Sequence, residues 1–283
     1  EIDRRAEAVI DGVIDRGGCD FVQDIAAQVP VQMICEMIGL EPEQWPRMFE
    51  ISNDVIGARN DPEYAHVDAE AASGEIYALC DAVAEDRRLH PRDDLMTALV
   101  QAEIDGERLD NLELNLFFIS LVVAGNETTR NLINHSLLAL LDHPEQAERL
   151  RQDPSLWDSA VEEMLRWGSS IHNFRRTATR DTQLRGVDIA EGDKVVIYYA
   201  SANRDEEVFD SPHTFDVGRT PNDHVTFGGG GVHYCLGASL ARAEIRATMR
   251  QVVERLPGIE LVGPPDRLAS DFVNGIKRMP VKW

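Results

Sequence analysis

The spacing of hydrophobic residues along the chain predicts a mainly helical protein. Apolar residues recur every three or four positions over residues 3–16, 20–40 and 47–90, with breaks at Pro30 and near Pro62. Further helices are expected at three places: after Asp93 or Asp94, over 155–167 and over 238–256. The chain should therefore consist largely of short amphipathic helices packed on a common core.

One predicted helix is much longer than the others and covers residues 109–142. Its middle, residues 116–123, is almost entirely apolar, which predicts a helix buried on all sides. The apolar run is too interrupted to cross a membrane. This helix should form the centre of the fold.

A small β region is expected in the second half of the chain. Alternating or β-branched residues predict strands over 174–179, 182–187 and 194–199, and a hairpin about Asn274 and Gly275. No internal repeat or low-complexity segment divides the sequence. The fold class is thus mainly α with a small β region, in a single domain over residues 1–283.

The amino-acid composition limits the classes of binding partner and the cellular compartment that can be expected. The formal net charge is −22, and phosphate binding needs clustered cationic residues, so nucleic acid is not an expected partner. The four cysteines fit neither a disulfide framework nor a zinc ribbon, which indicates a reducing compartment. No membrane span or secretory signal is visible, so a cytoplasmic protein is expected.

The most informative segment covers residues 227–242. Four consecutive glycines, Gly228 to Gly231, precede Cys235 and a helical pattern from Ala238. A cysteine just before a helix meets unpaired N–H groups and the positive end of the helix dipole, which favours a thiolate and hence a metal ligand. The glycine spacing does not fit a dinucleotide loop, and zinc partners at finger spacing are lacking. A plain turn with a buried cysteine is the remaining alternative.

This segment resembles the haem-binding loop of cytochrome P-450, the family of haem-thiolate monooxygenases. The family pattern Phe-Gly-x-Gly-x-His-x-Cys-x-Gly is matched, with one extra residue, by Phe227, Gly228, His233, Cys235 and Gly237. The extra residue is similar to a variant in actinobacterial enzymes that act on sterols and branched lipids. The resemblance covers nearly the whole chain and implies the cytochrome P-450 fold.

The resemblance assigns roles to the residues of this loop. Cys235 would be the axial ligand of the iron in haem b, and Phe227 would shield its sulfur. His233 would reach a haem propionate, and Gly237 would let the following helix approach the porphyrin. Arg176, in a segment similar to the family's Arg-x-Ala-Thr strand, would bind a propionate. The alternative for Arg176 is a solvated charge on a strand.

A second motif lies inside the long predicted helix. Gly125 costs about 1 kcal/mol of helix stability relative to alanine, and Thr128 can bond a carbonyl of the preceding turn and bend the helix. The segment resembles the family's oxygen-activation motif. That resemblance implies catalytic roles for Thr128 and Glu127 and places Ala124 and Gly125 beside the cofactor. The alternative is a hinge of small residues with a solvated glutamate.

A third pair has a structural interpretation. Glu163 and Arg166 are three residues apart and share one face of a predicted helix. A surface pair at this spacing contributes little stability. The resemblance instead implies a buried pair, joined by Arg219, that holds the loop of Cys235 in position.

The implied reaction inserts one oxygen atom of O2 into a C–H bond of a hydrophobic substrate. A sterol side chain or branched lipid is expected, and a terpene is the alternative. Phe272 and Val273 would contact this substrate, and residues 47–90 would form either a lid over it or an ordinary helical hairpin. A haem protein without turnover, or a helical scaffold without cofactor, are the other function classes.

Electrons would come from an external ferredoxin and its reductase, because no flavin or nicotinamide motif is present. Arg242, Arg246 and Arg250 form a stripe that could receive an acidic ferredoxin, or could pair with Glu244 or Glu254. The family domain is usually longer, so the resemblance also implies that an N-terminal part is absent from this sequence.

Overall fold

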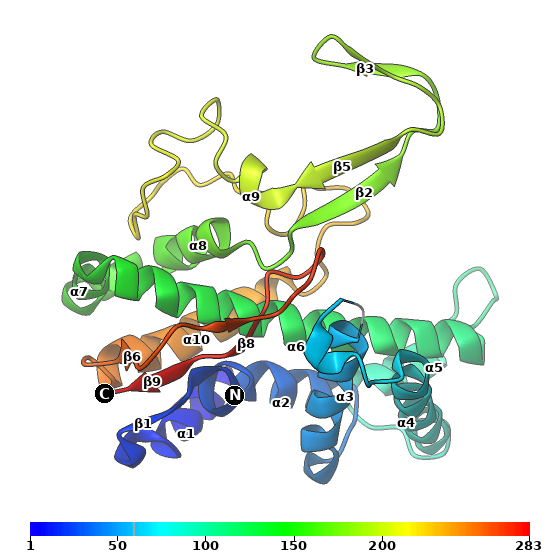
Figure 1. Cartoon of the computed structure of the whole chain (residues 1–283). Helices are drawn as coiled ribbons and strands as arrows, with labels where there is room; N and C mark the ends of the chain where they lie inside the picture. The colour runs from blue at the N-terminus through cyan, green and yellow to red at the C-terminus, as the bar shows by residue number, and fades with distance from the viewer. Residues whose placement is uncertain (59) are drawn as a thin grey trace.

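The computed structural model describes residues 1–58 and 60–283, which form a helical body with small sheets at its edge. The long helix α6 (Asn111–Asp142) runs through the body, as Figure 1 shows. The other principal helices are α1 (Ile2–Asp11), α2 (Gln28–Met37), α3 (Trp45–Gly57), α4 (Ala69–Leu89), α5 (Leu95–Gln101), α7 (Pro144–Gln152), α8 (Trp157–Gly168) and α10 (Ala238–Arg255). The mainly helical fold class predicted from the sequence is confirmed.

The start of α6 is fixed by a capping box. The Asp110 carboxylate accepts a hydrogen bond from Glu113 N at 2.8 Å, and the Glu113 carboxylate accepts one from Asp110 N at 3.0 Å. These bonds satisfy N–H groups that have no partner within the helix. The two halves of α6 enter two different cores, one with α2–α5 and one with α1, α8 and α10.

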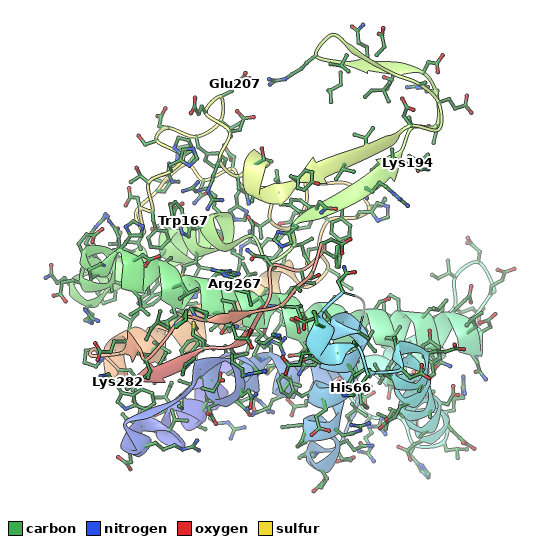
Figure 2. The ribbon with its side chains drawn as sticks, in the orientation of Figure 1. His66, Trp167, Lys194, Glu207, Arg267 and Lys282 are labelled. Atoms are coloured by element: carbon green, nitrogen blue, oxygen red, sulfur yellow. The ribbon has the colours of Figure 1, made fainter. Side chains whose placement is uncertain are left out.

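The strands form a β region at the edge of the helical body. β2 (Asn173–Thr177) pairs with β5 (Lys194–Tyr198), and β3 (Thr182–Leu184) pairs with β4 (Val187–Ile189). The hairpin of β3 and β4 projects from the body, and Glu207 reaches back to it to bind Arg185 at 2.7 Å (Figure 2). A third sheet joins distant parts of the chain in the order β1 (Gly18–Asp20), β9 (Pro280–Lys282) and β6 (Glu260–Leu261).

One predicted strand is too long and one predicted hairpin is wrong. The strand expected over 182–187 ends at Leu184, because Arg185 and Gly186 adopt positive φ and form a hairpin turn, and the turn at Gly186 is as the sequence predicts. Asn274 and Gly275 are not a hairpin turn. The tail pairs β7 (Asp266–Arg267) with β8 (Ile276–Arg278) instead.

The prediction that α6 is buried on all sides is also wrong. Leu116 is 49% exposed and Phe117 is 40% exposed, whereas Phe118 and Val122 are buried in the core shared with α4. Neighbouring helices cover one face of this half of α6, and the opposite face is uncovered. Of the helices in residues 1–58 and 60–283, none has the length and apolarity that crossing a bilayer requires.

Candidate functional site

The glycine-rich loop forms a tight turn that ends at Cys235. Gly228, Gly230 and Gly231 have φ between 77° and 99°, a region that side chains disfavour, which explains the run of glycines. Cys235 N donates to Phe227 O at 3.0 Å and closes the loop. α10 begins three residues later, at Ala238. The cysteine therefore lies just before a helix N-terminus, as its spacing predicts.

Cys235 differs from the other three cysteines in its surroundings. Cys35 and Cys80 are buried and Cys19 is half-buried, whereas Cys235 is exposed. Burial raises the pKa of the Cys35 thiol to about 12 and that of Cys80 to about 12, which makes both poor metal ligands. The exposed Cys235 excludes the alternative of a plain turn around a buried cysteine.

A polar cluster of Glu162, His224 and Arg242 holds the first residues of the glycine-rich loop, ahead of Cys235. Arg242 donates to Glu162 at 2.6 and 2.9 Å, and His224 Nε2 lies 3.0 Å from Glu162 Oε2. Burial raises the pKa of Glu162, but the hydrogen bonds from His224 and Arg242 outweigh burial and lower the pKa to about 2. Arg242 also lies 4.5 Å from the ring centroid of Phe227. The cluster thus fixes the ring at the start of the loop.

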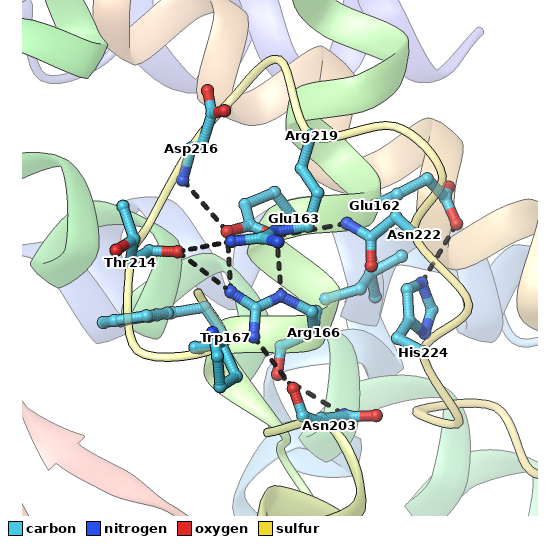
Figure 3. Close-up of polar contacts among 12 residues, drawn as sticks. Glu162, Glu163, Arg166, Trp167, Asn203, Thr214, Asp216, Arg219, Asn222 and His224 are labelled. Atoms are coloured by element: carbon cyan, nitrogen blue, oxygen red, sulfur yellow. Dashed lines mark hydrogen bonds and ion pairs between the residues drawn. The ribbon is translucent and has the colours of Figure 1, made fainter. Parts of the chain in front are cut away.

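A second cluster lies deeper, around Glu163 (Figure 3). Arg166 Nε and Nη2 donate to the Glu163 carboxylate at 2.7 and 2.8 Å, and both side chains are fully buried. Arg219 Nε donates to Glu163 at 3.0 Å, and Asn222 Nδ2 donates at 3.1 Å. The structure therefore brings together the three residues that the sequence groups, and adds Asn222 to them.

Asn203 connects this buried cluster to the glycine-rich loop. Its backbone oxygen accepts from Arg166 Nη1 at 2.8 Å, and its side-chain oxygen accepts from Val225 N at 2.8 Å. Its Nδ2 donates to Thr226 Oγ1 at 3.0 Å, one residue before Phe227. A continuous path of short bonds thus leads from the Glu163 cluster to the segment that carries Cys235.

The uncovered face of α6 carries small and polar side chains. Ala124 is exposed and Thr128 is half-buried, four residues apart and so on one face of the helix. Thr128 Oγ1 donates to Ala124 O at 2.7 Å, the bond to the preceding turn that the sequence predicts. This face could accept a flat apolar group, because its small side chains leave room and the Thr128 hydroxyl already has a partner in Ala124 O.

Glu127 points away from that face. It is 2% exposed, forms an ion pair with Arg130 and accepts a bond from Asn131 Nδ2 at 2.8 Å. Arg130 Nη1 also donates to Asn53 of α3 at 2.6 Å. Glu127 and Arg130 line a cavity of about 150 Å³ that Tyr64 and Lys277 also border. The alternative of a solvated glutamate is therefore wrong.

Comparison with known proteins decides the family. The family model for cytochrome P450 matches residues 19–283. The chain belongs to the cytochrome P450 family. A methyl-branched lipid omega-hydroxylase of Mycobacterium tuberculosis is 48% identical over 267 residues, which cover 93% of this chain and 62% of the relative. A steroid C26-monooxygenase of Mycobacterium tuberculosis is 41% identical over 283 residues, which cover 100% of this chain and 65% of the relative.

Solved structures agree with this assignment. A Mycobacterium marinum cytochrome P450 in complex with pseudoionone superposes with a TM-score of 0.94 at 38% identity, and the match covers 100% of this chain and 69% of that chain. This P450 chain spans less than two thirds of the length of the curated relatives named above.

The residues present fit the haem that the P450 family holds through a cysteine thiolate. The thiol of Cys235 is exposed, and a Cβ built on Gly230 or Gly237 would meet nothing within 4 Å. The partly uncovered face of α6 carries Ala124 and Thr128. In the β region, Val196, Ile197 and Tyr198 are large apolar side chains left 42–59% exposed. An exposed soft sulfur donor suits an iron centre, and uncovered apolar side chains suit a porphyrin.

The remaining predicted site residues lie as follows. His233 and Arg176 are exposed, and Arg176 Nη1 donates only to the neighbouring Arg175 O at 3.0 Å among the contacts of the described residues. Phe272 is half-buried and packs edge-on against Phe174, with 5.3 Å between ring centroids. Val273 is buried. Haem and substrate contacts of these four residues stay predictions.

The arginine stripe on α10 is only partly as predicted. Arg250 pairs with Glu254 at 2.8 Å, as one alternative had it. Glu244 pairs with none of the three arginines, because it is buried on the opposite face of the helix. Arg246 instead reaches Asp158 of α8 at 2.6 Å. All three arginines of the stripe, Arg242, Arg246 and Arg250, thus form ion pairs at a partly exposed surface.

Gly125 is needed for helix packing. A Cβ at this position would lie 3.0 Å from Ile34 Cγ1 of α2, tighter than normal contact. Gly125 is expected to open a groove in α6. On the side where a Cβ would point, it instead packs against α2. A haem contact of its backbone stays a prediction.

This packing predicts opposite effects at two helical glycines. Gly125→Ala should destabilise the protein by about 1–3 kcal/mol through overpacking. Gly74→Ala in α4, where a Cβ meets nothing within 4 Å, should stabilise it by up to about 1 kcal/mol through helix propensity. Urea unfolding of both variants checks the prediction. A stabilised Gly125→Ala protein would contradict it.

Sequence reasoning missed Asn203 and Asn222 of the Glu163 cluster, and also Glu162, His224 and Asn131. Glu162, His224 and Arg242 lie on separate segments, and only the fold brings the two partner side chains to the Glu162 carboxylate. Asn131 follows the recognised motif by one residue, and its helical spacing of four from Glu127 was a usable signal.

Proposed function

We propose that this P450 is a haem-thiolate monooxygenase that hydroxylates an aliphatic C–H bond of a hydrophobic substrate. The observation that carries the proposal is the exposed Cys235 at the end of the glycine-rich loop, in a chain of this family. The names of the relatives, a lipid omega-hydroxylase and a steroid C26-monooxygenase, support the reaction class.

Cys235 binds the iron of haem b through its Sγ in this proposal, and Phe227 shields that sulfur from solvent. His233 and Arg176 bind the propionates. Gly237 and Ala124 leave room for the porphyrin plane, and Gly125 contacts it through its backbone. The haem, when bound, supplies the activation of O2 and the oxidation of the C–H bond.

The overall reaction consumes two protons and two electrons. The substrate RH and O2 give ROH and H2O, so one oxygen atom enters the new C–O bond and the other leaves as water. Thr128 lies on the reacting side of α6, with its hydroxyl proton bonded to Ala124 O. Glu127, buried beside Arg130, holds the carboxylate that relays protons in this proposal. Cys235, as thiolate, would hold the haem iron and donate electron density to it.

The two electrons come from outside the chain, with a ferredoxin and its reductase as the proposed source. The partly exposed arginines of α10, next to the Cys235 loop, suit an acidic partner of this kind. We place the enzyme in the cytoplasm and treat residues 1–283 as part of one catalytic domain.

The proposed substrate is a sterol side chain or a methyl-branched lipid. The names of the relatives at 40–48% identity support this class. A terpene-like substrate is the second candidate, since the similar Mycobacterium marinum protein was solved in complex with pseudoionone. Phe272, beside Phe174, offers an aromatic surface that would pack against either substrate.

The absorption spectrum of the dithionite-reduced, carbon-monoxide-bound protein tests the proposal. A strongly red-shifted Soret band is expected in the wild type and in Cys19→Ser, and its loss is expected in Cys235→Ala. Cys19 is the control because it is also partly accessible but lies on β1. A normal Soret position in the wild type would refute thiolate ligation by Cys235.

Turnover with a ferredoxin, a reductase and NADPH then tests the substrate class. A hydroxylated product that carries ¹⁸O from ¹⁸O2 is expected from a sterol or a methyl-branched fatty acid. If only a terpene is hydroxylated, the second candidate replaces the first. If none of the three is hydroxylated by haem-loaded protein, the enzymatic proposal is wrong.

A further inference from the structure

The side chain of Asn131 holds the proposed proton carrier and the C-terminal tail at the same time. Its Nδ2 donates to Glu127 Oε1 at 2.8 Å and to Glu127 O at 2.9 Å. Its Oδ1 accepts from the backbone N–H of Ile276, 145 residues further along the chain, at 2.9 Å. Asn131 is fully buried, so water does not compete for these bonds.

The orientation of this amide is fixed by chemistry. The Ile276 N–H can only donate, so the oxygen of Asn131 must face it. The nitrogen of the same amide must then face the Glu127 carboxylate, which can only accept when ionised. One rigid planar group thus transmits the position of the tail to the position of the carboxylate.

The tail segment before Ile276 is itself held firmly. Asn274 N donates to Ser170 O at 2.8 Å, and His135 Nε2 lies 2.8 Å from Asn274 O. Asn274 Nδ2 donates to Gly168 O at 3.1 Å. Burial lowers the pKa of His135 to about 4, so this histidine is neutral near pH 7. Phe272, the proposed substrate contact, is four residues from Ile276. If substrate displaces Phe272, the short, restrained segment between them should move Ile276 and with it the hydrogen bond to Asn131.

We propose that Asn131 is a positioning residue that couples substrate occupancy at the tail segment to the orientation of the Glu127 carboxylate. The inference rests on the proposed monooxygenase function and deepens it. Its consequence is that proton relay is set for hydroxylation only when the tail is in its substrate-bound position. Without this control, O2 takes two electrons from the reductase and two protons and leaves as H2O2.

Three variants separate this role from a structural one. Asn131→Leu removes both contacts at similar volume. Asn131→Asp keeps the oxygen that accepts from Ile276 N–H but loses the donors to Glu127. Asn134→Leu is the matched control, because Asn134 is equally buried on the same helix and makes no hydrogen bond through its side chain among the described residues.

The fraction of NADPH recovered as hydroxylated product is measured with haem-loaded protein. We expect it to fall about tenfold in Asn131→Leu, the low end for losing the partner that orients a site ligand, with H2O2 rising in proportion. Asn134→Leu should keep the wild-type fraction. Asn131→Asp places a second carboxyl beside Glu127, which also pairs with Arg130. A proton shared between the two carboxyls at acid pH should restore coupling in Asn131→Asp as pH falls, whereas Asn131→Leu should not recover. A merely structural role predicts no such pH dependence.

Hydrogen–deuterium exchange gives a readout that needs no turnover. Substrate should slow exchange of the Ile276 amide, and Asn131→Leu should abolish that protection. Equal coupling in Asn131→Asp and Asn134→Leu at all pH values, or an Ile276 amide that ignores substrate, would overturn the inference. A wild type that forms no product would instead refute the proposed function, while the exchange result still judges the link between tail and substrate.

Discussion

Replacing Arg166 with methionine is expected to lower the free energy of unfolding by about 3–5 kcal/mol, because it leaves a buried carboxylate without its main partner. Arg166 is fully buried and makes a two-bond pair with Glu163 at 2.7 and 2.8 Å. It also donates to the backbone oxygens of Asn203, Pro212 and Thr214. Since total stability is about 5–15 kcal/mol, the loss should be close to unfolding the protein.

The matched control is Arg47→Met. Arg47 also makes a two-bond pair with a glutamate, Glu75, at 2.7 and 2.8 Å, but half of its side chain is exposed. An exposed pair contributes about 0–1 kcal/mol, so this variant should unfold at nearly the wild-type urea concentration. Similar small losses in both variants would show that burial adds nothing to the Glu163 cluster.

Haem content should follow the same order. The Glu163 cluster reaches the Cys235 loop through Asn203 and Val225, so Arg166→Met should also retain less haem than Arg47→Met. The ratio of Soret to protein absorbance after purification measures this.

Much of the fold could be predicted from local patterns, because helices follow from periodicity alone. The capped start of α6, the break near Pro62 and the N-cap Asp94 all lie where short-range rules place them. The strands β1, β6 and β9 could not be found in this way. Each has only two or three residues, and they pair across the length of the chain.

In the candidate site, too, local sequence patterns predict some residues, whereas others depend on contacts between distant parts of the chain. Cys235 and its glycines form a contiguous motif, so the sequence identifies them directly. The burial of Glu163 and Arg166 does not follow from their spacing, since exposed helices carry the same pair, and it came from the resemblance alone. The Asn131 contact with Ile276 is fixed only by tertiary packing, which no local pattern encodes.

Glu244 is a position where helix geometry was sufficient to predict the outcome. Residues two apart on a helix do not share a face, so Glu244 could not join the stripe of Arg242 and Arg246. It is 1% exposed and lies against α6. Burial raises the pKa of the Glu244 carboxyl to about 8, although hydrogen bonding by Thr129 opposes the shift.

This pKa predicts a stability that declines as pH rises. In the unfolded chain Glu244 has the ordinary pKa of 4.5, so between pH 4.5 and about 8 the folded protein holds a proton that the unfolded chain has lost. The stability linked to that proton is complete below pH 4.5 and is lost as pH rises toward 8. Glu244→Gln keeps a neutral side chain at every pH and should not show this loss.

Urea unfolding at pH 5 and pH 8 checks the prediction. The stability of Glu244→Gln relative to the wild type should increase between the two pH values by up to about 4 kcal/mol, at 1.36 kcal/mol per pH unit. The free energy of unfolding of Glu254→Gln, a variant on the exposed face of the same helix, should differ from that of the wild type by the same small amount at pH 5 and at pH 8. If Glu244→Gln also shows no change between pH 5 and pH 8, Glu244 is ionised in the folded protein. The interface between α10 and α6, the helix that carries Thr128, would then contain a buried charge.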